Sequence, residues 1–151
     1  MRRLLTRFIF RPWWRLSRGM TIGVRAVVAR DGTVLLVRHS YVPGWHLPGG
    51  GVERGETVVE ALTHELREEG NITLDATPRL FGVYSSEPHF RGDHVLLYVA
   101  DAWRQDGPYK PGMEILEAAF FPLDDLPEGT TPGTRRRLAE VFDAAALDDH
   151  W

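Results

Sequence analysis

Four glutamates near the middle of the chain have the types and the spacing needed to hold a divalent cation. Glu65, Glu68 and Glu69 lie at positions i, i+3 and i+4 of a stretch, residues 57–69, without Pro or Gly. On a helix this spacing places three mutually repelling carboxylates on one face, and Glu56 just before the stretch could reach the same region. Oxygen ligands favour Mg²⁺, Mn²⁺ or Ca²⁺ over zinc. A metal site is therefore one interpretation, although a charge run considered alone more often forms a solvated helix face.

The residues around these glutamates predict a helix held against a core. Thr57 has the side chain of an N-cap, and Gly70-Asn71 ends the helix because both residue types tolerate a left-handed backbone. The three glycines at 49–51 let the backbone approach a ligand closely. Apolar residues repeat at helical spacing away from the glutamates and should anchor the helix: Val59, Leu62 and Leu66.

Val-rich segments on both sides of this helix predict strands. Residues 23–29 and 34–38 flank Asp31-Gly32, a pair typical of a hairpin turn. Further strands are expected at 79–85, 94–103 and 119–123, and a final helix at 134–146. Strands placed before, between and after helices predict an α/β or α+β sandwich.

Composition limits the remaining alternatives. The chain has 151 residues, the size of one domain, and 43% hydrophobic with 26% charged residues is typical of a soluble globular protein. It contains no cysteine, which excludes a disulfide scaffold, a thiolate zinc site and a cysteine nucleophile. A cytoplasmic location fits this composition, with peripheral attachment to the inner membrane face as the alternative.

The first 20 residues differ from the rest in charge. Residues 1–30 contain eight arginines and no acidic residue. All 21 acidic residues lie at position 31 or later. We therefore divide the chain into a basic amphipathic arm, 1–20, and a domain, 21–151. The arm could dock on its own acidic domain, on a homodimer mate or on a membrane surface. The acidic body argues against a nucleic-acid groove.

The full spacing around the glutamates resembles the Nudix box. From Gly50, five residues lead to Glu56, and seven more lead to position 64, which precedes Glu65-Leu66-x-Glu68-Glu69. The family pattern is Gly, five residues, Glu, seven residues, then Arg-Glu-aliphatic-x-Glu-Glu-x-Gly-aliphatic. The box covers Gly50–Ile72, and the resemblance spans about residues 21–142. It implies a Nudix-like α/β/α sandwich with a central mixed β-sheet.

Two positions depart from the family pattern. His64 occupies the place of an Arg that orients the catalytic carboxylates in the family, and Asn71 occupies the place of a Gly. Histidine can donate a hydrogen bond, but it is shorter than Arg and its charge varies near neutral pH. The change at Asn71 is mild, because Asn tolerates the same backbone conformation.

The resemblance implies a Mg²⁺-dependent hydrolase, with Mn²⁺ as an alternative, that cleaves a nucleoside diphosphate linked to another group. Glu56 and His64 would support the reaction, and Glu65 would serve as a ligand or as the base. A carbonyl of Gly49 or Gly50 would add a ligand. The carboxylates implied to bind metal are Glu65, Glu68, Glu69 and one from a later loop, for which Glu114 is expected and Glu117 is the alternative.

The substrate stays open at this point. ADP-ribose, nucleotide sugars and (deoxy)nucleoside triphosphates are the candidates, and Pro88 lies near a proline of ADP-ribose hydrolases although a lone loop proline is usually just a turn. The alternative is a non-catalytic module that binds a nucleotide or a protein, favoured only by His64. Residues expected to line a nucleotide pocket are Tyr41, Trp45, His46, Tyr84 and Arg91.

Overall fold

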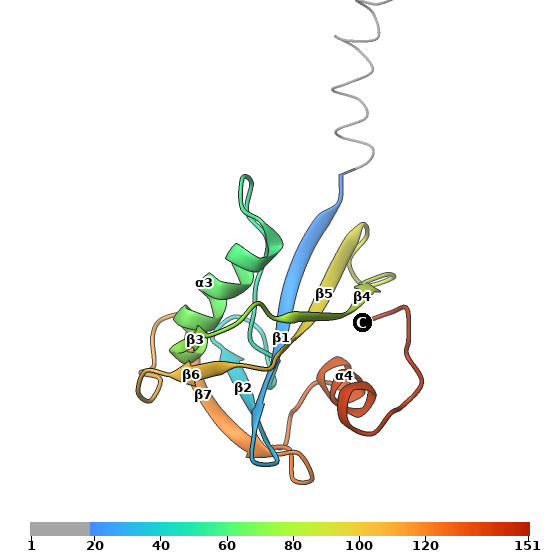
Figure 1. The fold of residues 1–151 in the computed structure, drawn as a ribbon. Helices are drawn as coiled ribbons and strands as arrows, with labels where there is room; N and C mark the ends of the chain where they lie inside the picture. The colour runs from blue at the N-terminus through green and yellow to red at the C-terminus, as the bar shows by residue number, and fades with distance from the viewer. Residues whose placement is uncertain (1–18) are drawn as a thin grey trace, which may run out of the picture.

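Two helices enclose a mixed β-sheet in the computed structural model, which describes residues 19–151 (Figure 1). The five strands of this sheet are β1 (Thr21–Arg30), β2 (Thr33–His39), β4 (Arg79–Ser85), β5 (Asp93–Ala100) and β7 (Ile115–Pro122). The helices α3 (Val58–Gly70) and α4 (Pro132–Phe142) lie on opposite sides of it. A second, two-stranded sheet joins β3 (Ile72–Leu74) to β6 (Trp103–Gln105).

The strand order is β4-β5-β1-β2-β7, with β1 and β5 parallel and the other pairs antiparallel. The predicted α/β/α sandwich with a central mixed sheet is therefore confirmed. Among residues 19–151, no helix is long and apolar enough to cross a bilayer. The predicted arm lies outside the described residues, apart from Gly19 and Met20.

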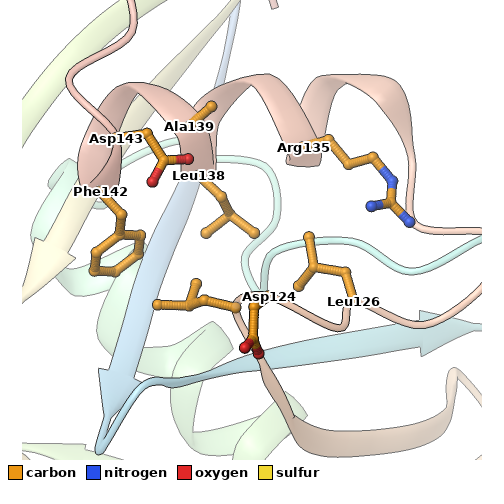
Figure 2. Close-up of a pocket in the computed structure, with 8 residues that line it drawn as sticks. Asp124, Leu126, Arg135, Leu138, Ala139, Phe142 and Asp143 are labelled. Carbon is orange, nitrogen blue, oxygen red and sulfur yellow. The ribbon is translucent and has the colours of Figure 1, made fainter.

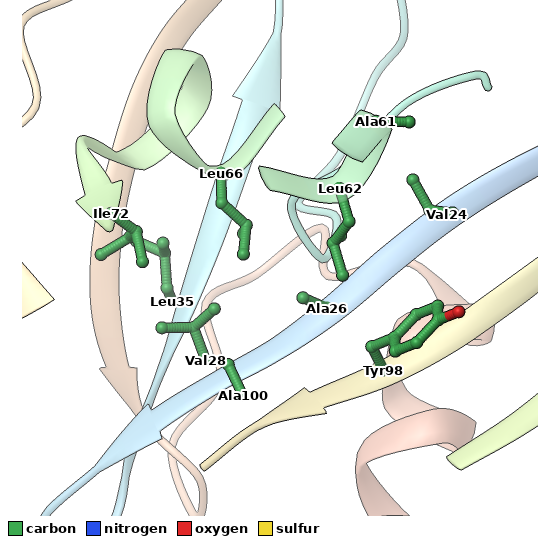
Figure 3. Close-up of a cluster of buried hydrophobic side chains, with 10 residues drawn as sticks. All are labelled: Val24, Ala26, Val28, Leu35, Ala61, Leu62, Leu66, Ile72, Tyr98 and Ala100. Atoms are coloured by element: carbon green, nitrogen blue, oxygen red, sulfur yellow. The ribbon is translucent and has the colours of Figure 1, made fainter. Parts of the chain in front are cut away.

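Strand alternation divides the core between the two faces of the sheet. Val24, Ala26 and Val28 of β1 point toward α3, where Leu62 and Leu66 pack against them (Figure 3). On the other face a second cluster lies beneath α4: Val27, Val34, Leu36, Trp45, Leu47, Tyr84, Leu97 and Leu138.

The glycine-containing segment before α3 is inserted between β1 and β2. These two strands pair directly only near their turn, at Ala29 and Val34. Farther along, the segment fills the gap, because the Ala26 amide donates to the Pro48 carbonyl at 3.0 Å and the Val37 amide donates to the His46 carbonyl at 2.9 Å. This insertion brings the glycines to the edge of α3.

The ends of α3 are those that the sequence predicts. Thr57 accepts from the Glu60 amide and Glu60 accepts from the Thr57 amide, so the two residues form a capping box. Asn71 ends the helix with a left-handed backbone, φ 55°. Both signals are local in sequence, which is why they could be recognised there.

Other boundaries differ from the predictions. The expected strand at 94–103 is divided at Asp101-Ala102 into β5 and β6, because the Asp75 amide binds the Ala102 carbonyl and β6 then pairs with β3. β7 begins four residues before the expected strand, at Ile115. The last helix ends at Phe142 rather than at 146, and the chain then returns to β4, where the Trp151 amide donates to the Ser85 carbonyl.

Candidate active site

The glutamates of α3 face the inserted glycine segment. The Glu69 side chain is almost entirely buried, and one of its oxygens accepts a hydrogen bond of 2.7 Å from the Gly49 amide. Glu65 lies against Gly50, where an added Cβ would fall 2.1 Å from the nearer carboxylate oxygen. Gly49 has φ +140°, and a Cβ there would fall 2.0 Å from the Val24 carbonyl oxygen. The glycines therefore permit a close approach that no side chain would allow.

Glu69 is an acid whose charged form is poorly supported by the protein alone. Burial raises its pKa to about 8, which outweighs the opposing hydrogen bond from the Gly49 amide. His39 lies beside this acid, with its Nδ1 3.7 Å from a Glu69 oxygen. Burial lowers the pKa of His39 to about 4, so this imidazole is neutral near pH 7 and does not compensate the carboxylate.

Glu65 and Glu68 complete the acidic face of α3. Glu65 is half-buried, and burial raises its pKa; Arg25 lowers it, and the charges of Glu68 and Glu114 raise it further. Glu68 is exposed. Within residues 19–151, no three acidic or His side chains already form a closed metal-binding group. The donor set nevertheless suits a hard cation, since it consists of oxygens beside a buried acid with a raised pKa.

His64 contacts one box carboxylate from the exposed surface of α3. Its Nδ1 lies 2.9 Å from a Glu56 oxygen, and the other Glu56 oxygen accepts from the Glu53 amide at 3.0 Å. His64 thus reaches the loop before the helix. The structure brings His64 and Glu56 together, as a pair that holds this loop.

Two basic residues at the site were missed at the sequence level. Arg25, on β1, lowers the pKa of both Glu65 and Glu69, and its Nη1 is buried without a hydrogen-bond partner among residues 19–151. His39, at the end of β2, lies against Glu69. The only sequence signal for Arg25 was a charge inside an otherwise apolar strand pattern, GVRAVVA. Which carboxylates it faces depends on strand order.

Gly49 and Gly50, either of which was expected to offer its carbonyl to a metal, have different hydrogen bonds in the structure. The Gly50 carbonyl accepts a hydrogen bond of 2.8 Å from the Val24 amide, so it is directed into the backbone ladder with β1. Gly49 instead lies with its amide on Glu69. Because a carbonyl oxygen has two lone pairs, the bond from Val24 leaves Gly50 able to bind a cation, and both carbonyls stay predictions.

Glu114 and Glu117, the two expected loop carboxylates, have different surroundings: the charge of Glu114 acts on Glu65 and raises its pKa. The Ser40 amide donates to the Glu114 carbonyl at 2.8 Å, and the next residue, Ile115, pairs with His39. Glu117 is held by Arg38, with 3.0 Å between the guanidinium nitrogen and the carboxylate oxygen.

Two residues expected in a nucleotide pocket are core residues instead. Trp45 is 9% exposed and packs edge-on against Phe121, with 4.7 Å between the ring centroids. Tyr84 is 1% exposed, and its hydroxyl donates to Glu140 at 2.8 Å. Both belong to the buried cluster that includes Leu138 of α4, on the face of the sheet opposite α3. Aromatic type near a strand end did not distinguish a core from a pocket.

The other three pocket candidates are less buried. Tyr41 is 72% exposed beside His39, with 5.1 Å between the ring centroids. His46 is half-buried, and its Nε2 lies 3.0 Å from the Pro43 carbonyl oxygen. Arg91 is exposed in the loop between β4 and β5.

A groove on the molecule lies away from these glutamates (Figure 2). It is formed between α4 and the turn after β7, with a volume of about 440 Å³. The residues that line it are Leu123, Asp124, Leu126, Arg135, Leu138, Ala139, Phe142 and Asp143. It contains none of the predicted site residues.

Comparisons with known proteins agree with this architecture. A family model for the NUDIX domain matches residues 19–142. An ADP-ribose pyrophosphatase from Methanocaldococcus jannaschii is 35% identical over 118 residues, which is 76% of this chain and 69% of that protein. The NAD-capped RNA hydrolase NudC from Shigella dysenteriae is 35% identical over 123 residues, but the chain spans only 46% of its length.

Solved structures similar to this chain also include Nudix hydrolases. A MutT NUDIX hydrolase from Burkholderia pseudomallei superposes with a TM-score of 0.68 at 31% identity, covering 80% of this chain and 97% of the other. An ADP-ribose pyrophosphatase from Streptococcus suis superposes with a TM-score of 0.67 at 25% identity, covering 87% and 95%. With the box, the fold and these relatives in agreement, the chain belongs to the Nudix family and is a hydrolase of pyrophosphate bonds.

Proposed function

We propose that the chain is a Mg²⁺-dependent pyrophosphohydrolase acting on ADP-ribose or a related nucleoside diphosphate sugar. The observation that carries the metal dependence is Glu69, a buried acid beside two further carboxylates. The charge of Arg25 only partly offsets its burial, and its pKa stays raised to about 8. The substrate class is supported by the relatives from M. jannaschii and S. suis, which are named ADP-ribose pyrophosphatases.

The residues that would hold Mg²⁺ are Glu68, Glu69 and the carbonyl of Gly49 or Gly50, joined by Glu65 or Glu114. Mn²⁺ would suit the same oxygen donors. When bound, such a cation neutralises phosphate charge, polarises a phosphoryl oxygen and lowers the pKa of coordinated water.

The protein's own groups would prepare and complete the attack of water on the diphosphate. Glu65 is proposed to accept the proton of the attacking water, because its raised pKa is closer to neutrality than that of an ordinary carboxylate. Arg25 is proposed to contact phosphate oxygens, because its buried Nη1 has no partner within the described protein. Glu56 and His64 would keep the loop before α3 in place.

Tyr41 and His46 are the best remaining candidates for contacts to the nucleoside, with Arg91 in a peripheral position. Tyr41 lies near the acidic face, since after burial the charge of Glu69 raises its pKa further. A nucleoside triphosphate is the second candidate substrate, because a relative from Bacillus subtilis, 32% identical over 132 residues, is named a putative 8-oxo-dGTP diphosphatase.

A substrate panel tests this proposal. ADP-ribose, UDP-glucose, dGTP, 8-oxo-dGTP and NAD would be incubated with Mg²⁺, and the products separated by ion-exchange chromatography. Glu69→Gln would serve as the inactive variant and Glu117→Gln as the matched control, since Glu117 is held by Arg38. Turnover of ADP-ribose that is lost only in the Glu69 variant supports the proposal. Folded protein that hydrolyses none of the panel would favour a binding module.

We further propose that residues 1–20 are a basic arm outside the catalytic domain, docked in the cytoplasm on its own acid-rich surface or on a second copy. Anionic lipid is the second candidate, since the arm combines Arg with Trp and Phe. Sedimentation with phosphatidylglycerol vesicles would compare the full chain with a variant in which Arg2, Arg3, Arg7 and Arg11 become Gln. Salt-sensitive binding by the wild type and not by the variant supports a lipid-binding arm. Equal sedimentation of the two proteins contradicts it.

A further inference from the structure

Asn71 fastens the start of the loop between β6 and β7 to the end of α3. Its Nδ2 donates to the Asp106 carbonyl at 2.8 Å and to the Gly107 carbonyl at 3.1 Å. The Asp106 amide in turn donates to the Asn71 carbonyl at 3.1 Å. The family pattern has Gly at this position. Gly would adopt the same left-handed backbone, but it has no side chain to donate the two bonds.

Other side chains also connect the end of α3 and β3 to residues 105–106, but they bind different atoms from those that Asn71 binds. Arg67 and Thr73 bind the carboxylate of Asp106, at 2.8 and 2.7 Å. The Gln105 side chain donates to the Gly70 carbonyl at 3.0 Å, one residue before the loop. Among the described residues, only the Asn71 side chain binds the backbone carbonyls of both Asp106 and Gly107.

Glu114 lies at the other end of this loop, where its charge acts on Glu65 of the acidic face. Its carbonyl accepts from the Ser40 amide, and the Tyr109 hydroxyl and the Gly112 amide bind the carbonyl of Ile115, which pairs with His39. His39 itself lies against Glu69. The loop thus runs from the C-terminal end of α3 back to the carboxylates of the same helix, and it is fixed at both ends.

We propose that Asn71 is a positioning residue for Glu114, holding the loop at 106–114 so that its carboxylate joins those of α3 around a divalent cation. The inference rests on the proposed function, because it assigns Glu114 a place in the metal site. It also gives a role to the departure from Gly within the box. A residue that leaves the helix end unchanged has gained two hydrogen bonds to the loop that delivers the fourth carboxylate.

The decisive variant is Asn71→Gly, because it restores the family residue and keeps the left-handed turn while removing both side-chain bonds. It would be combined with Glu114→Gln in a double-mutant cycle. Mn²⁺ binding to metal-free protein would be measured by electron paramagnetic resonance, and backbone amide exchange would be followed in residues 107–114.

We expect Asn71→Gly to weaken Mn²⁺ binding by about three- to tenfold, as the loss of two net hydrogen bonds allows, and to speed amide exchange in the loop. In the Glu114→Gln background the same change should have no further effect on Mn²⁺ affinity, because the carboxylate it positions is gone. In turnover, the Mg²⁺ concentration for half-maximal rate should rise by the same factor, with kcat within about twofold.

Gln105→Ala is the matched control, since it removes one side-chain bond between α3 and β6 but none to the loop backbone. An equal loss of affinity in this control, additive effects in the cycle, or an unchanged Mn²⁺ affinity in Asn71→Gly would each overturn the inference. A wild-type chain that binds Mn²⁺ but has no turnover would contradict the proposed function only. The double-mutant cycle, read by Mn²⁺ affinity, would still decide the role of Asn71. A wild-type chain that binds no Mn²⁺ overturns both.

Discussion

Two glutamates, one on each helix, are buried to nearly the same extent but have opposite surroundings. Glu140 on α4 is 6% exposed, and its carboxylate accepts from the Arg137 guanidinium at 2.6 Å, the Tyr84 hydroxyl at 2.8 Å and the Asp148 amide at 3.0 Å. Glu69 on α3 is 5% exposed and, within the part of the chain that the structure describes, accepts a single hydrogen bond, from the Gly49 amide.

The environment of each acid indicates its purpose. A buried charge costs stability unless it is paired and hydrogen-bonded, and Glu140 meets both conditions within the protein. Arg137, fully buried, also stacks over the Tyr84 ring at 4.1 Å, so this network holds α4 and the C-terminal residues to β4. Glu69 is instead surrounded by other carboxylates and a neutral imidazole, and the charge of Arg25 only partly offsets its burial. Its missing partner is what the proposed cation would supply.

Of the substitutions considered, replacing Glu69 should cause the largest loss of activity, and it should not destabilise the fold. Glu69→Gln keeps the side chain's size and removes its charge, so turnover with Mg²⁺ should fall by roughly 10³-fold. Without metal, the variant should remain folded, with a midpoint of thermal unfolding at or above that of the metal-free wild type, because a poorly compensated acid is removed. Circular dichroism and product chromatography would be run on the same samples. Full activity would end the proposed role of Glu69.

Replacing Glu140 should have the opposite profile. Glu140→Gln leaves the Arg137 charge buried without its partner, and the free energy of unfolding should fall by about 3 kcal/mol. Urea denaturation measures this loss, and turnover per folded molecule should change less than twofold at a temperature where the variant is folded. A variant as stable as the wild type would show that the two acids do not differ as described.

The stability of the metal-free protein should also depend on pH through Glu69. Its pKa is about 8 in the folded state and near 4.5 in the unfolded chain, so its stabilising contribution is present below pH 4.5 and is lost as the pH rises toward 8. His39 acts in the opposite direction, because its pKa of about 4 removes stability as the pH falls below 6.5.

Between pH 6.5 and 8, Glu69 therefore makes the stability depend on pH while His39 does not. In the presence of EDTA, the wild type should lose up to about 2 kcal/mol of stability across this range relative to Glu69→Gln. Urea titrations at several pH values measure the difference. Parallel pH curves for the two proteins would show that Glu69 is already ionised in the folded chain.

How much of this could be predicted from sequence depends on the range of the signal. The capping box at Thr57, the end of α3 at Asn71 and the face shared by the three glutamates are local patterns, and they appear as expected. The insertion of the segment at 45–50 between β1 and β2 depends on pairings between distant residues. Strand order, in the same way, places Arg25 at the site and Tyr84 in the core. Periodicity alone does not reveal either.

The smallest effect is expected at His64. Its side chain is 66% exposed, so its ion pair with Glu56 should contribute little. His64→Ala should lower kcat/KM by about two- to fivefold without a change in stability, whereas His64→Arg, which restores the family residue, should match or exceed the wild type. A loss as large as that of the Glu69 variant would place His64 in the reaction itself.

Mg²⁺ titration of the metal-free protein at pH 8, followed by the midpoint of thermal unfolding, tests the contrast between the two acids most directly. We predict a midpoint that rises with Mg²⁺ concentration in the wild type and in Glu117→Gln but stays constant in Glu69→Gln, because that variant lacks the buried carboxylate that gains a partner. An equal rise in the Glu69 variant would contradict it, and would place the cation elsewhere on the molecule.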